Sequence, residues 1–194
     1  MSEMAKKGRI IVISGPSGVG KSTICREVIR RTGAAISVSM TTRTKSATEV
    51  EGVDYCFVTK GQFKKAVKEG SFLEYAEVFG NSYGTPKGPV LKALDEGRNV
   101  ILTIDVQGGL QVQKQFPDTV LVFILPPDTG ELAERIARRG RDSGEAIQQR
   151  LFGSTDEMAV AWKHYPQMVV NDNLERAINE VTKIVQEVDS EQKK

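Results

Sequence analysis

The chain has 194 residues, of which 39% are hydrophobic, and its formal net charge at pH 7 is +2. This length suits one α/β domain with a small insertion. A charge so close to zero does not indicate a polyanionic partner, so we expect no nucleic-acid binding. No uninterrupted apolar run reaches 18 residues, so we expect no membrane span either.

The compartment follows from the N-terminal segment and from the cysteines. Residues 1–9 are polar and lack the apolar core of a signal peptide. Cys25 and Cys56 show neither the C-x-x-C spacing nor the neighbouring histidines of a zinc site. Both are read as ordinary thiols in a reducing compartment, and we expect a cytoplasmic protein. The sequence is compatible with a monomer and with a homo-oligomer.

The first elements along the chain surround a phosphate-binding loop. Residues 15–22 read GPSGVGKS, which matches G-x-x-x-x-G-K-[ST]. An apolar run of strand length, 9–14, precedes it, and a helical pattern, 21–31, follows. Such a loop folds its backbone N–H groups around phosphate, its lysine reaches the β- and γ-phosphates, and its serine faces Mg²⁺. The expected donor-site residues are Gly15, Pro16, Ser17, Gly18, Val19, Gly20, Lys21, Ser22 and Thr23, with Ser22 as the metal contact.

The rest of the chain alternates strands with helices, apart from one interruption. Apolar strand patterns cover 99–105, 119–125 and 168–171, and helical patterns cover 87–96, 109–115, 128–139, 145–163 and 174–188. This alternation predicts an α/β fold with three layers and a parallel central sheet.

The interruption covers about residues 38–83 and reads as a small, β-rich insertion. Strand patterns cover 54–58 and 71–77, and Thr59 with Gln62 forms a capping box that starts a helix reaching Glu69. From the pattern alone, this insertion is equally suited to holding a second substrate and to serving as a structural flap.

Together, these motifs closely resemble the guanylate kinase family over about residues 10–185. Besides the phosphate-binding loop, the resemblance rests on SVSMTTR at 37–43, Glu49-x-x-Gly52-x-Asp54-Tyr55, Glu74, GNSYGT at 80–85 and IDVQG at 104–108. The family transfers the γ-phosphoryl group of ATP to GMP, uses Mg²⁺ and closes a lid over both nucleotides. The resemblance therefore implies one domain with a core of about 8–37, 86–126 and 164–190, a GMP-binding insertion of about 38–85 and a helical lid of about 127–163.

The resemblance also implies roles for individual acceptor-site residues. It assigns Arg43, Tyr55 and Tyr83 to the GMP phosphate, and Glu74, Thr85 and Ser39 to the guanine pocket. A carboxylate complements the N1–H and N2–H₂ donors of guanine, and a hydroxyl can donate to O6. Asp105 contacts the guanine in this interpretation, and contact with Mg²⁺ through water is the alternative. Asn171 is assigned to the adenine side of ATP.

The lid is expected to supply arginines to the transferred phosphoryl group. Arg135 and Arg139 lie four residues apart on one helix face, and Arg150 follows on the next helix. The alternative is a solvated helix held by Glu131–Arg135 and Glu134–Arg138 pairs. No protein base is expected, because the second pKa of a phosphate monoester is about 6 and GMP is already largely ionised at pH 7.

The chain departs from the family pattern at two positions. Ser46 stands where the family usually has a second phosphate-binding arginine, with Lys45 beside it, and Thr103 stands where an acidic residue is common. Two other functions remain open at this stage. One is a phosphate-binding-loop kinase for another small acceptor, such as ribose bisphosphate or a different nucleotide. The other is a scaffold module that binds protein ligands without catalysis.

Overall fold

The computed structural model describes residues 7–78, 80–137 and 144–192. Its central sheet has the strand order β2-β7-β1-β8-β9, and all neighbouring strands are parallel. The strands are β1 (Ile10–Ser14), β2 (Ala35–Ile36), β7 (Val100–Leu102), β8 (Val120–Leu125) and β9 (Gln167–Val170). The expected α/β fold with a parallel sheet is confirmed.

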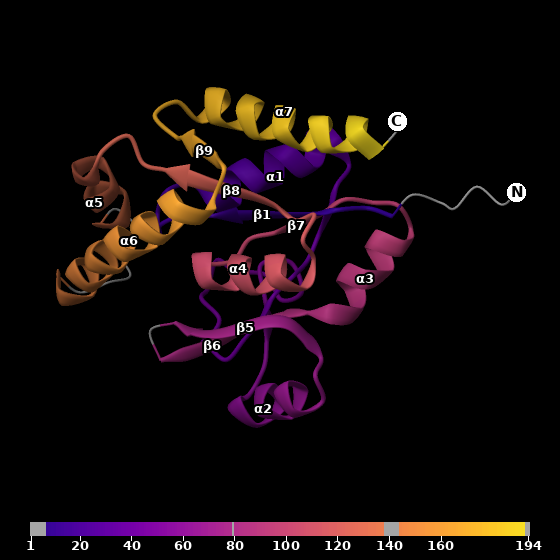
Figure 1. Ribbon diagram of the computed structural model, residues 1–194. Helices are drawn as coiled ribbons and strands as arrows, with labels where there is room; N and C mark the ends of the chain where they lie inside the picture. Colours follow the sequence, from indigo (N-terminus) through magenta and orange to yellow (C-terminus); the bar gives the residue numbers. More distant parts are fainter. Residues whose placement is uncertain (1–6, 79, 138–143, 193–194) are drawn as a thin grey trace, which may run out of the picture.

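Helices cover both faces of this sheet (Figure 1). α1 (Lys21–Thr32) and α7 (Leu174–Gln192) lie on one face, and α3 (Lys87–Asp95) and α4 (Val106–Gln115) lie on the other. β1 contributes side chains to the hydrophobic core on each face of the sheet, because successive strand side chains point in opposite directions. Ile11 and Ile13 pack with α1 and α7, whereas Ile10 and Val12 pack with α3 and α4.

A second, mixed sheet forms from the insertion, in the order β4-β3-β6-β5. Its elements are β3 (Met40–Thr41), β4 (Cys56–Phe57), α2 (Lys60–Lys68), β5 (Phe72–Val78) and β6 (Asn81–Pro86). The capping box at the start of α2 is confirmed, with Thr59 and Gln62 bonding each other's backbone N–H. The patterns gave no strand over β6, whose NSYGTP sequence contains both glycine and proline.

Two boundaries differ from the expected ones at the edge of the central sheet that faces the site. The strand expected over 99–105 ends at Leu102, and the helix expected from 109 begins at Val106. The reason is Asp105, whose side chain accepts a hydrogen bond from the Gly108 N–H and so caps α4.

The remaining helices, α5 (Thr129–Ala137) and α6 (Gly144–His164), lie side by side at one end of the sheet (Figure 1). The Tyr165 hydroxyl, directly after α6, hydrogen-bonds Ser14 Oγ at 2.9 Å. This contact fixes the C-terminal end of α6 against the strand that leads into the phosphate-binding loop. Among the described residues, no helix is long and apolar enough to cross a membrane.

Candidate active site

The loop between β1 and α1 has the backbone that its sequence requires. Gly18 and Gly20 adopt φ values of 90° and 104°, a region that side-chain-bearing residues rarely occupy. The Lys21 ammonium folds back over the loop, where it donates to the carbonyl of Gly15 and, at 2.9 Å, to that of Pro16. Ser22 lies exposed in the first turn of α1.

Asn171, at the end of β9, supports this loop from the side. Its Nδ2 donates to the Val19 carbonyl at 2.7 Å, and the residue is 4% exposed. A Cβ at Gly20 would lie 2.5 Å from the same nitrogen, so only glycine fits there. The amide expected to face adenine is thus bonded to the donor loop in this structure.

Arg135 connects α5 to the same loop. Its Nη1 donates to the Val19 carbonyl at 3.4 Å, and its Nη2 donates to the Asn171 carbonyl at 3.1 Å. The alternative Glu131–Arg135 pair is present too, at 2.6 Å. Arg139 lies outside the described residues, and Arg150 is placed only as a backbone position within α6.

The mixed sheet gathers the residues expected at the acceptor phosphate. Antiparallel pairing of β3 with β6 sets Thr41 opposite Tyr83, which brings Arg43 near the aromatic cluster. The Arg43 guanidinium carbon lies 5.4 Å from the ring centre of Tyr55, and the rings of Tyr55 and Tyr83 are 5.9 Å apart. A cation and two phenols thus share one surface.

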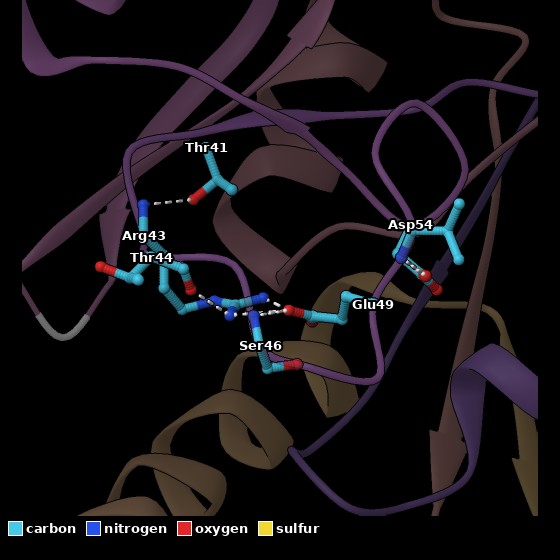
Figure 2. Close-up of polar contacts among 7 residues, drawn as sticks. Thr41, Arg43, Thr44, Ser46, Glu49 and Asp54 are labelled. Carbon is cyan, nitrogen blue, oxygen red and sulfur yellow. Dashed lines mark hydrogen bonds and ion pairs between the residues drawn. The ribbon is translucent and has the colours of Figure 1, made fainter.

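Glu49 is part of the same group, although the sequence motif gave it no role. Figure 2 shows its carboxylate gripping the Arg43 guanidinium with two hydrogen bonds, of 2.7 and 3.0 Å. The hydrogen bond from Arg43 lowers the pKa of Glu49 to about 2, and Glu49 in turn raises the pKa of Arg43. Glu49 is therefore ionised throughout the working pH range of an enzyme.

Glu74 and Thr85 pair directly across β5 and β6. The Thr85 hydroxyl donates to Glu74 Oε1 at 2.6 Å, and the two residues are only 5% and 1% exposed. Burial raises the pKa of Glu74 to about 7, opposed by the hydrogen bond from Thr85 and reinforced by Asp105. A β-bulge between Phe72 and Glu74 changes the register, which explains how a charged residue turns inward.

The start of α4 lies against this carboxylate. A Cβ at Gly108 would be 2.9 Å from Glu74 Oε2, so the absence of a side chain there leaves room for it. Asp105 Oδ1 accepts the Gly108 N–H at 2.9 Å. Glu74 and Asp105 thus approach the same end of α4.

The structure also places Ser39 and the two residues that depart from the family pattern, Thr103 and Ser46. Ser39 lies between β2 and β3, and its carbonyl accepts the Cys56 N–H at 2.9 Å. Thr103 bonds Cys25 Sγ at 3.5 Å. The Ser46 N–H donates to Glu49 Oε2 at 2.9 Å, so the position of the missing arginine takes part in the Glu49 group.

Glu157, on α6, is a site residue that the sequence patterns missed. It lines a cavity of about 250 Å³ together with Asp105 and Glu77. Burial raises the pKa of Glu157 to about 7; Lys21 opposes this shift and Asp105 adds to it. Its spacing of four residues from the buried Ala161, on the same helix, was the one available sign that it faces inward.

Comparison with known proteins identifies the family. A family model described as guanylate kinase matches residues 7–188. A guanylate kinase of Clostridium perfringens is 48% identical over 180 residues, covering 92% of this chain and 83% of the relative. One from Streptococcus pneumoniae is 45% identical over 185 residues, covering 94% and 88%.

A solved structure agrees with these relatives. The crystal structure of guanylate kinase from Anaplasma phagocytophilum superimposes with a TM-score of 0.78 at 31% identity. It covers 97% of this chain and 88% of the solved one. The agreement therefore extends over the central sheet and the insertion alike, and the chain belongs to the guanylate kinase family of enzymes.

Proposed function

We propose that the protein transfers the γ-phosphoryl group of ATP to GMP, giving ADP and GDP, in the cytoplasm. The observation that carries this proposal is the buried Glu74–Thr85 pair beside the cluster of Arg43 and two tyrosines. A carboxylate suits the N1–H and N2–H₂ of guanine, and the arginine with the phenols suits a phosphate. Adenine has a lone pair at N1 and offers no donor there.

On the donor side, the backbone of residues 15–23 cradles the phosphates of ATP, and Lys21 is the fixed cation nearest the transferred group. A phosphate anion would give the ammonium an oppositely charged acceptor in place of the neutral Gly15 and Pro16 carbonyls that it now contacts. The Asn171 side chain, held against Val19, borders the same loop and is proposed to contact the adenine.

Mg²⁺ is the cofactor that fits these residues. The Ser22 hydroxyl is exposed next to Lys21, and a hydroxyl oxygen is a donor that Mg²⁺ accepts alongside nucleotide phosphates and water. When bound, the ion would neutralise charge on the β- and γ-phosphates. Across the described residues there is no group of three histidine, cysteine or acidic side chains able to hold a metal, so Ser22 would supply the protein ligand.

On the acceptor side, Arg43, Tyr55 and Tyr83 hold the GMP phosphate, while Ser39, Glu74, Thr85 and Asp105 line the base pocket. GMP attacks through a phosphate oxygen that is already ionised, so this chain's residues position and neutralise charge rather than remove a proton. His164, the single histidine, ends α6 exposed to solvent, which fits a reaction without a histidine base.

The lid of about residues 127–163 is proposed to bring arginines to the transfer site, and the insertion of about 38–85 to carry GMP. Arg135 already reaches the donor loop. Arg139 and Arg150 are assigned the same charge-stabilising role from the sequence.

The test is release of ADP with purified protein, ATP and Mg²⁺, using GMP, AMP, dTMP and ribose bisphosphate as acceptors. We expect turnover with GMP and very little with the others. Equal use of AMP and GMP would overturn the guanine pocket, and efficient use of ribose bisphosphate would assign another kinase activity. Absence of turnover with every acceptor would favour a non-catalytic binding module.

A further inference from the structure

The Arg43 guanidinium has two edges that can each donate a pair of hydrogen bonds, and Glu49 contacts one of these edges. Both hydrogens of Nη1 are used, one by the Thr44 carbonyl at 2.9 Å and one by Glu49 Oε2 at 3.0 Å. Nη2 gives one hydrogen to Glu49 Oε1 at 2.7 Å. The other edge, formed by Nε–H and the second hydrogen of Nη2, is not used by Glu49, and the Tyr83 hydroxyl is a further hydrogen-bond partner of the Arg43 side chain. That edge can still grip an anion in the bidentate way that suits phosphate.

Glu49 is itself held in place. Its Oε2 accepts the Ser46 N–H at 2.9 Å, and its own N–H donates to the Ser46 carbonyl at 3.2 Å. The next residue, Val50, is fixed by its N–H bond to Asp54 Oδ2 at 2.8 Å. The side chains of Arg43 and Glu49 are 28% and 14% exposed. The carboxylate is thus a fixed, half-buried anchor rather than a mobile surface charge.

We propose that Glu49 is a positioning residue for the acceptor phosphate: it locks Arg43 so that the Nε–H edge faces the GMP phosphate. This inference rests on the proposed function. The backbone N–H of residue 46 anchors Glu49, and Arg43 is the arginine that contacts the phosphate in this arrangement. Binding then depends on how Arg43 is oriented, since the ionised Arg43–Glu49 pair contributes no net charge.

A competing role for the same contact makes the opposite prediction. If Glu49 occupied the place of the phosphate, GMP would have to displace it, and removing its charge would tighten GMP binding. The two-edge geometry opposes this, because the phosphate and the carboxylate can bind the guanidinium together.

The experiment measures kcat and the KM of each substrate for Glu49→Gln, with Glu51→Gln as the matched control. Glu51 is exposed in the same loop and bonds the Phe57 N–H rather than Arg43. In Glu49→Gln, one of the two carboxylate oxygens is replaced by an amide NH₂. This NH₂ then faces a group that donated to Glu49, either the Arg43 guanidinium or the Ser46 N–H. We expect the KM for GMP to rise about tenfold, with kcat and the KM for ATP within about twofold of the parent. Glu51→Gln should leave the KM for GMP unchanged or slightly lower.

A second pair of variants separates positioning from general loop structure. Glu49→Gln is also introduced into the Arg43→Ala variant. There we expect it to add little to the increase in the KM for GMP that Arg43→Ala already causes. If Glu49→Gln raised the KM for GMP by the same factor in the parent protein and in Arg43→Ala, Glu49 would shape the loop and would not act through Arg43. A lower KM for GMP in Glu49→Gln would show that Glu49 competes with the phosphate. Either result would overturn the inference while leaving intact a parent that turns over GMP. A parent without GMP turnover would instead end the proposed function.

Discussion

Lys21 is the residue whose contacts should change most when ATP binds. In the structure its ammonium bonds two carbonyls of its own loop, one at 2.9 Å. These are neutral partners, and a phosphate would exchange them for charged ones. The side chain adds nothing to the apolar core, so its removal affects chemistry more than folding.

We therefore expect Lys21→Ala to remain folded and to lose about 100- to 1,000-fold in kcat, the cost of removing one preorganised charge-stabilising group. Lys7→Ala is the control, because it also removes a lysine, but one whose ammonium forms an exposed ion pair with Asp95. Steady-state kinetics and thermal melting on both variants give the answer. Parent-like turnover in Lys21→Ala would rule out the assigned role of the loop.

Glu74 is the residue whose protonation state is most directly tied to the proposed recognition of guanine. Burial raises its pKa to about 7, and the Thr85 hydroxyl, with its single hydrogen, donates to it. That hydrogen cannot donate to the O6 of guanine at the same time. In the proposed guanine pocket, GMP binding would therefore require the hydroxyl to turn, and N–H groups of the base would replace it on the carboxylate.

This geometry predicts a pH effect. In the proposed pocket the ionised form of Glu74 is the one that would accept the guanine donors, and this form becomes populated as the pH rises through about 7. We expect kcat/KM for GMP to rise between about pH 6 and 8, and Glu74→Gln to remove that rise. Thr85→Val takes away the bond that lowers the pKa, so its midpoint should move upward.

Two other groups titrate nearby, and the same experiment separates them. GMP phosphate ionises with a pKa of about 6 in every variant. Glu157 has a raised pKa of about 7, so Glu157→Gln is the matched variant and should keep the Glu74 midpoint. A rise that survives in Glu74→Gln would show that another group controls it. Glu74 also affects folding: because its pKa in the folded protein lies above the ordinary value of 4.5 for a glutamate, its contribution to stability falls as pH rises from about 4.5 to 7.

How far these residues could be predicted from sequence depends on the kind of signal. The phosphate-binding loop is local, since eight consecutive residues specify its glycine conformations. Glu74 could be named only through the family motif, because strand alternation is broken by the bulge beside it. Glu49 was present in the motif without a role, since its partners Arg43 and Ser46 are fixed by a turn that no periodicity reports.

At the scale of elements, the Arg135 side chain joins α5 to the donor loop by hydrogen bonds. Arg135 pairs with Glu131 on its own helix and also donates to the carbonyls of Val19 and Asn171. The Glu131–Arg135 pair, which was the alternative to a role at the transferred phosphoryl group, therefore coexists with contacts to the loop expected to hold the donor phosphates. The helix was predictable from its 3.6-residue period, but its docking required the positions of β9 and the loop.

We expect Arg135→Ala to lower kcat by about 100-fold or more, since a charged group would be lost beside the donor phosphates. Arg135→Lys should fall between it and the parent, because an ammonium keeps the charge but not the fork. Arg30→Ala serves as the control, since Arg30 is an exposed arginine on α1 paired with Glu27. An unchanged kcat in Arg135→Ala would leave only the ion pair with Glu131 as its role.

For the whole molecule, the residues proposed for the donor and acceptor sites lie on separate parts of the fold. The loop belongs to the central sheet, Arg43 and Glu74 belong to the mixed sheet, and Arg135 belongs to α5 (Figure 1). The order of strands and helices predicted this division, because one β-rich segment interrupts an otherwise regular alternation. Their relative distance in the working state is not encoded in any local pattern.

Phosphoryl transfer needs both phosphates in line and water excluded, so we expect the insertion and the α5–α6 region to move inward when both sites are filled. Small-angle scattering would compare the protein alone, with ADP, with GMP and with a bisubstrate analogue that joins the two nucleotides. The radius of gyration should decrease most with the analogue, because it alone links the two sites. Arg43→Ala provides a matched control: it should weaken the response to GMP and leave the response to ADP intact. An analogue that binds with unchanged radius of gyration would mean that the two sites already lie at reacting distance without closure.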